Sequence, residues 1–208
     1  MGAGRAPGKR GAARLNRADW IAAGQAVLCE AGIAGLRLSA LTRRLGASTG
    51  SFYHHFEDMD AYLAVLARQF TRADVRRILD RAAQGASGPL SRIRRLAAIS
   101  LSSRIFPLDR AMRVWATSDR RAAASVKAAE KLVLAFLTDA FRELGFSPDD
   151  AALRAHLLLS ANVALIGAFR LTGDRAFFER SLDLLTRDAP ARAAGATRPP
   201  AASAIRRS

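Results

Sequence analysis

Cysteine is nearly absent from this 208-residue chain, and acidic residues and long hydrophobic runs are scarce. The one cysteine, Cys29, cannot form an intramolecular disulfide, and no apolar run after Met1 has the length of a secretory signal. The longest weakly polar stretch, Ala155 to Phe169, is shorter than the roughly 20 residues that span a bilayer. These absences predict a cytoplasmic protein that has no membrane partner.

Sustained two-residue alternation of β-branched residues is absent too, whereas apolar residues recur at helical spacing in almost every segment between Gly and Pro breaks. Because 50% of the residues are hydrophobic, a buried core can form. We therefore predict an all-α fold. Helices are expected over 17–31, 39–45, 48–55, 58–83, 90–105, 108–117, 120–144, 148–171 and 175–186.

Both ends of the chain contain few large apolar residues. Residues 1–16 predict a flexible basic arm, and residues 188–208, rich in Ala, Arg and Pro, predict a disordered tail. Between them, residues 17–60 predict a small helical head and residues 61–187 a larger helical domain.

Lys and Arg outnumber Asp and Glu by 33 to 18, which gives a formal net charge of +15. Up to Phe56, eight basic residues face only Asp19 and Glu30. A surplus of this size favours polyanionic partners, with nucleic acid ahead of anionic lipid.

A helix-turn-helix pattern lies at about 37–56. Ser39 and Ser48 are suitable N-caps for two short helices, and Gly46 closes the first. Phe52 and Phe56, four residues apart, predict the buried face of the second helix, whose other face would lie in a DNA major groove. The residues expected at DNA from this pattern are Arg43, Arg44, Ser48, Thr49, Gly50, Ser51, Tyr53 and His54. The alternative is that the tyrosine and histidines form a partly exposed edge of a small core.

From Trp20 to about Leu66 the sequence resembles the TetR family of repressors. The resemblance lies in residues 20–23, 41–48 and 50–56, whose order and spacing match without a gap. It implies a three-helix DNA-binding head, a C-terminal domain that binds a small-molecule effector, and a homodimer built from the last two helices. Ser39 falls at a position that commonly touches DNA in the family. Met59 departs from the family pattern, where a lysine is usual.

Candidate pocket and interface residues follow from this resemblance. Pocket candidates are Phe106, Met112, Trp115 and His156, although aromatic residues at helical spacing are often plain core, and His156 is a better candidate for a core or interface histidine. Small residues make the 148–171 helix thin on one side, which suits close helix packing across a two-fold axis or within one subunit. Dimer-interface candidates are Leu157, Ser160, Ala164, Gly167, Phe178 and Leu182.

Other chemistries are not indicated by the sequence. His54 and His55 diverge on a helix and have no Cys or carboxylate at zinc-ligand spacing, and Cys29 is expected to be a buried thiol rather than a redox sensor. We find no nucleophile elbow, phosphate loop or paired carboxylates. We predict no catalytic residues, metal or cofactor. We predict a DNA-binding regulator whose partner is a palindromic operator. The rival interpretations are an enzyme that uses a hydrophobic pocket and a nonspecific architectural DNA binder.

Overall fold

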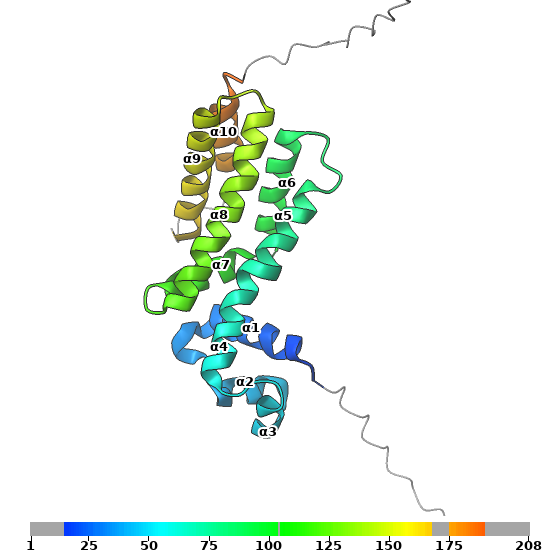
Figure 1. The fold of residues 1–208 in the computed structure, drawn as a ribbon, viewed down its shortest axis with the longest axis vertical. Helices are drawn as coiled ribbons and strands as arrows, with labels where there is room; N and C mark the ends of the chain where they lie inside the picture. The colour runs from blue at the N-terminus through cyan, green and yellow to red at the C-terminus, as the bar shows by residue number, and fades with distance from the viewer. Residues whose placement is uncertain (1–14, 104, 168–174, 190–208) are drawn as a thin grey trace, which may run out of the picture.

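The computed structural model describes residues 15–103, 105–167 and 175–189, and every regular element in these ranges is a helix (Figure 1). This confirms the all-α prediction for that part of the chain. The predicted arm and tail lie almost entirely outside the described residues. The elements are α1 (Arg17–Gly35), α2 (Leu38–Leu45), α3 (Thr49–Tyr53), α4 (Met59–Gln69), η1 (Phe70–Val75), α5 (Arg76–Ala83), α6 (Pro89–Ser102), α7 (Ile105–Ala116), α8 (Arg120–Glu143), α9 (Pro148–Gly167) and α10 (Arg175–Thr186).

An aromatic cluster holds α1, α3 and α4 together in the head. Trp20, Phe52 and Tyr62 are fully buried, and Phe56 is 3% exposed. Ring centroids lie 5.4 Å apart for Trp20 and Phe52 and 4.9 Å apart for Phe56 and Tyr62. Each buried ring of this size contributes about 1.5–3 kcal/mol relative to an exposed one. The prediction that Phe52 and Phe56 face the core is confirmed, and the core fixes α3 against the rest of the head.

Helices α4, η1 and α5 follow one another without a break and connect the head to the larger domain (Figure 1). The predicted 58–83 helix therefore has the expected extent, with the Asp58 side chain accepting a hydrogen bond from Ala61 N at its start. The segment η1 is a π-helical turn that the periodicity did not indicate. It buries two polar side chains, Thr71 and Asp74, where an α-helical stripe would place apolar ones.

Helix α8 is the central element of the larger domain and packs against α4, η1, α6, α7 and α9, while α10 packs on α9 (Figure 1). Two groups of buried side chains result. One extends from the head through Phe70 and Trp115, and the other joins Ile93, Phe141 and Leu182 at the opposite end. The first group therefore joins the head to the adjacent part of the larger domain, and the second is a separate core at the far end of that domain.

Three local expectations are corrected by the structure. Helix α2 starts at Leu38 with Arg37 as its N-cap, so Ser39 lies inside the helix rather than capping it. Helix α1 breaks at Gly32, as predicted, but a further turn extends it to Gly35; Gly32 has φ 65° and ψ −171°, a conformation that is essentially confined to glycine. Cys29 is exposed, because it lies on the face of α1 that turns away from the aromatic cluster. Among the described residues, no helix is both long and apolar enough to cross a bilayer.

Candidate nucleic-acid interface and ligand pocket

The turn between α2 and α3 is set by one glycine and one serine. Gly46 ends α2, as predicted, and does so in the left-handed conformation with φ 60°. Ser48 then caps α3, with its Oγ accepting a hydrogen bond from Ser51 N at 3.2 Å. The amides at the start of α3 lie at the surface, where they can bind a phosphate oxygen.

Most of the predicted DNA-facing residues, which lie in α2, in α3 and next to the ends of α3, are exposed. Tyr53 is 55% exposed although its neighbour Phe52 is fully buried. Ser51 alone among the nine candidates is half-buried; the exposed ones are Ser39, Arg43, Arg44, Ser48, Thr49, Gly50, Tyr53 and His54. The surface therefore presents hydroxyls, a phenol and an imidazole beside basic side chains, which are groups that bond phosphates and base edges.

The two arginines of α2 differ in how they are held. Arg44 donates to both carboxylate oxygens of Glu30 on α1, at 2.7 and 2.9 Å. This bidentate hydrogen bond raises the pKa of Arg44 and ties α2 to α1. Arg43 is exposed one residue earlier. Arg43 is thus better placed for a phosphate, whereas Arg44 must first leave Glu30 or bind with it in place.

His55 takes a structural position rather than a DNA-facing one. Its Nε2 lies 3.1 Å from the carbonyl oxygen of Leu15, at the start of the described chain. The described residues contain no group of three or more His, Cys, Asp or Glu side chains arranged to hold a metal ion.

Gly50 leaves its side of α3 open. A Cβ built on this residue would meet only Ser48 Oγ, at 3.8 Å, which is an ordinary contact. The fold therefore does not require glycine here. The lack of a side chain at Gly50 therefore matters only to a partner molecule that approaches α3 from outside.

Comparisons with known proteins support this interpretation of the head. Residues 21–66 match the family model described as "Bacterial regulatory proteins, tetR family". Residues 21–66 belong to the TetR family. The match begins in α1, includes the whole of α2 and α3, and ends within α4, so the chain carries the DNA-binding head of a transcriptional regulator.

Solved TetR-type structures share the fold well beyond the head. A TetR-family regulator from Agrobacterium tumefaciens is 16% identical, with a TM-score of 0.65 over 82% of this chain and 95% of that one. The regulatory protein TetR from Rhodobacter sphaeroides is 19% identical, with a TM-score of 0.67 over 82% and 96%. The reduced form of E. coli NemR is 19% identical, with a TM-score of 0.64 over 82% and 95%. No curated protein matches the chain by sequence.

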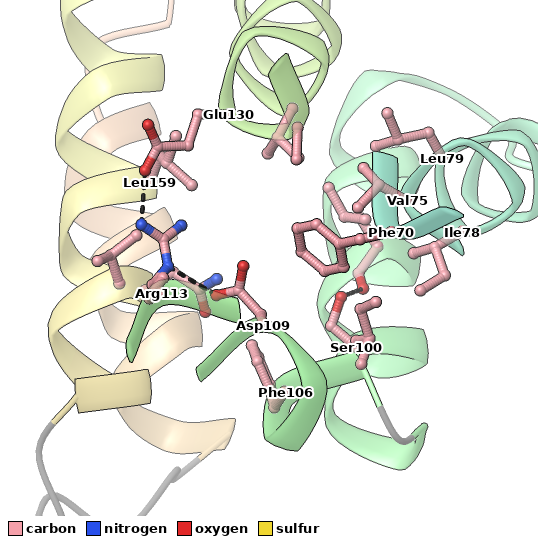
Figure 2. Close-up of a pocket in the computed structure, with 16 residues that line it drawn as sticks. Phe70, Val75, Ile78, Leu79, Ser100, Phe106, Asp109, Arg113, Glu130 and Leu159 are labelled. Atoms are coloured by element: carbon pink, nitrogen blue, oxygen red, sulfur yellow. Dashed lines mark hydrogen bonds and ion pairs between the residues drawn. The ribbon is translucent and has the colours of Figure 1, made fainter. Parts of the chain in front are cut away.

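Behind the TetR head, the larger domain encloses a cavity between η1 and α5 to α9 (Figure 2). Its interior volume is about 90 Å³, which is room for several water molecules or a small ligand and is below the roughly 300–1,000 Å³ of drug-sized ligand sites. Most of its walls are apolar. Asp109, Arg113 and Glu130 form an ion-pair chain on one side, in which Arg113 Nε lies 2.9 Å from Asp109 Oδ2 and Arg113 Nη1 2.6 Å from Glu130 Oε1.

Of the four pocket candidates, only Phe106 lines this cavity. Met112 and Trp115 are each 1% exposed and belong to the core that joins α7 to the head, which corrects their assignment. His156 is exposed on α9, with Nδ1 2.8 Å from Ala152 O, so it is neither a core residue nor a wall of the cavity. The sequence does not predict the charged triad of Asp109, Arg113 and Glu130, although the spacing of Asp109 and Arg113 is that of an ion pair on one helix face.

The interface candidates separate into outward and inward residues. Leu157, Ser160 and Ala164 lie on the exposed side of α9, and Leu157 is 50% exposed. Leu182 is fully buried inside its own subunit and Phe178 packs on the same core, which corrects the assignment of Leu182. Gly167 ends α9, and its exposure lies outside the described residues.

Proposed function

We propose that the chain is a homodimeric repressor that binds a palindromic double-stranded DNA operator and releases it when a small molecule occupies the larger domain. The exposed polar face of α3 carries this proposal. Thr49 and Tyr53 project from a short helix that the aromatic cluster holds in place. A helix of this kind can enter the major groove with its N-terminal residues at base edges.

The dimer part of the proposal is supported by an exposed apolar face. Four of the seven large hydrophobic side chains that are exposed in the described part of the chain lie on α9 and α10: Leu153, Leu157, Phe177 and Leu184. A two-fold axis through this face would present two copies of α3 to one duplex. Helices in successive major grooves require half-sites about 34–36 Å apart.

The release step is supported by the position of η1. Phe70 and Val75 of this segment line the cavity, while Asp74 accepts a hydrogen bond from Gln25 Nε2 of α1 at 2.6 Å. One turn of chain thus contacts both the cavity and the head. A ligand that binds one arrangement of η1 more tightly than another would shift the population of head positions.

The first experiment is selection of fragments from sheared genomic DNA by the purified protein at physiological salt, followed by sequencing. We expect a short palindrome whose half-sites are one helical turn apart. An even collection of fragments would instead favour the architectural binder, whose affinity comes from phosphate contacts and counterion release alone.

Variants of α3 test whether this helix reads the operator. Gly50→Ala adds one methyl group that the fold accommodates, so we expect the free energy of unfolding to be unchanged or slightly higher. We expect the operator affinity to fall about tenfold. Thr49→Ala is expected to reduce discrimination between the operator and a mismatched site. Arg142→Ala is the matched control, because it removes an exposed charge at the end of α8 remote from α3 (Figure 1). Equal losses in all three variants would contradict recognition by α3.

A further inference from the structure

The charges around the cavity do not balance. Its described lining includes three formally charged side chains, Asp109, Arg113 and Glu130, so two carboxylates share one guanidinium. Arg113 uses Nε for Asp109 and Nη1 for Glu130. The triad therefore carries a formal charge of about −1 beside walls that are mostly apolar.

Asp109 is the most enclosed member of the triad. Its side chain is 13% exposed, compared with 24% for Arg113 and 36% for Glu130. Burial raises the pKa of Asp109, while the hydrogen bond and charge of Arg113 oppose this effect. Figure 2 shows the Asp109 carboxylate between Arg113 and the ring of Phe70. A negative group thus faces the cavity at a place where water screens it poorly.

The remaining walls suit an apolar body with a cationic end. Phe70 and Phe106 supply aromatic rings, and cations bind favourably over ring faces. Most of the remaining lining is aliphatic, and Ser100 and Asn162 are its uncharged polar members. The aliphatic side chains include Val75, Ile78, Leu79, Leu96, Val133 and Leu159. An anion would compete with two carboxylates for one arginine, and a neutral molecule would leave the surplus negative charge uncompensated.

We infer that this cavity binds a small apolar monocation, such as a hydrophobic amine, with its charge beside Asp109 and Glu130 and its body against Phe70 and Phe106. The inference rests on the proposed effector function of the larger domain and specifies the chemical class of the effector. The cation supplies the positive charge that the triad lacks.

Three probes with one apolar body test this class: 4-phenylbutylamine, 4-phenylbutanol and 4-phenylbutyrate. Calorimetric titration of the full chain at pH 7 is expected to give at least about tenfold tighter binding for the amine than for the alcohol or the acid. Equal affinities, a preference for the acid, or no binding of the amine would overturn the inference.

Variants then locate the charge that selects the amine. Asp109→Asn is expected to reduce the preference for amine over alcohol to about threefold or less while leaving alcohol binding unchanged. Asp80→Asn is the matched control, because it removes an exposed carboxylate of α5 that does not line the cavity, and it should keep the full preference. If Asp109→Asn does not fold, Glu130→Gln, at the more exposed end of the triad, provides the same test. A preference that survives the triad variants would overturn the inference.

Operator binding separates this inference from the proposed function. If the amine binds with the expected preference and operator affinity does not change, the ligand class stands and ligand-driven release fails. If the acid or the alcohol releases the operator and the amine does not, release stands and the ligand class fails.

Discussion

Gly24 and Tyr62 determine how closely α1 and α4 approach in the head. A Cβ at position 24 would lie 1.8 Å from Tyr62 Oη and 2.9 Å from its ring carbon Cζ. The same hydroxyl donates a hydrogen bond to Trp20 O at 2.9 Å, and burial raises the pKa of Tyr62. The tyrosine is therefore fixed from two sides and cannot move aside cheaply.

Gly24→Ala is expected to lower the free energy of unfolding by about 1–3 kcal/mol, because the added methyl group overpacks this contact. Urea denaturation measures the loss. In a Tyr62→Phe background the colliding oxygen is gone, so the same substitution should cost less. Strict additivity of the two changes would contradict the contact described here.

Asp119 gives the second residue-scale prediction. It caps α8, and the side-chain hydrogen bond from Arg121, together with hydrogen bonds from the helix amides, lowers its pKa from 3.8 to about 2. A carboxylate whose pKa is lowered by folding stabilises the fold above its unfolded pKa, and this stabilisation is lost as the pH falls through the folded pKa. Asp119→Ala should therefore cost about 1 kcal/mol at neutral pH.

The difference in free energy of unfolding between the wild type and Asp119→Ala should become smaller as the pH falls from about 4 to about 2. Thermal unfolding over that pH range would measure it. Asp119→Asn is the control, because asparagine also caps helices but carries no charge. A gap for Asp119→Ala that stays constant down to pH 2 would show that the carboxylate charge contributes nothing to the cap.

At the scale of elements, the hydrogen bond between Gln25 of α1 and Asp74 of η1 connects the head to the cavity wall. Asp74 is 7% exposed; burial raises its pKa, and the hydrogen bonds from Gln25 and Arg77 oppose that effect. Removal of Gln25 leaves the buried carboxylate of Asp74 with one hydrogen-bond donor fewer, and such a loss typically lowers the free energy of unfolding by about 1–3 kcal/mol.

We predict that operator binding protects the η1 amides from hydrogen exchange in the wild type and protects them less in Gln25→Leu. Arg77→Leu is the matched control, since it removes the other partner of Asp74 but keeps the link to the head. Equal protection in the wild type and Gln25→Leu would mean that this hydrogen bond does not couple α1 to η1.

Most helices were predictable because their signals are local. Ser48, Asp58 and Gly46 act as caps or stops where their side chains or backbone freedom suit those roles. The π-helical turn was not predictable, because one extra residue in a turn leaves the apolar spacing on either side nearly unchanged. The N-cap at Arg37 was not predictable either, because Arg37 caps α2 with its backbone alone, whereas Ser39 has the side chain that is usual at an N-cap.

The candidate sites depend on contacts between distant segments, and the sequence predicts these less well. The exposed face of α3 follows mainly from the burial of Phe52, and Phe56, three residues beyond the end of the helix, is buried in the same core. The cavity charge requires Glu130 of α8 to meet Arg113 of α7, which no local pattern indicates. Leu182 and Leu157 have the same apolar character, but Leu182 is fully buried in a core shared with α6, α8 and α9, whereas Leu157 is 50% exposed on α9.

At the scale of the whole molecule, the exposed leucines of α9 give a test of the proposed dimer. Leu157→Glu places a charge where a second copy would pack, and the dimer dissociation constant should rise at least about a hundredfold. Light scattering after size-exclusion chromatography measures the mass, and operator affinity should fall with it. Val114→Glu on α7 is the control, because Val114 is 59% exposed and lies outside the proposed interface. Dissociation in both variants, or in neither, would contradict an interface at this face.

The uninterrupted backbone of α4, η1 and α5 also bears on how such proteins exchange parts during evolution or in the laboratory. This continuous helical segment contributes Tyr62 to the core of the head and Phe70 to the cavity wall. A chimera joined at residue 60 would therefore separate the head from the segment that completes its core. A chimera that joins this head to another sensor should retain residues up to Val75 and the matching surface of α1. If the proposed function holds, specificity for DNA and sensitivity to a ligand would therefore be exchanged together, because one continuous helical segment contributes to both domains.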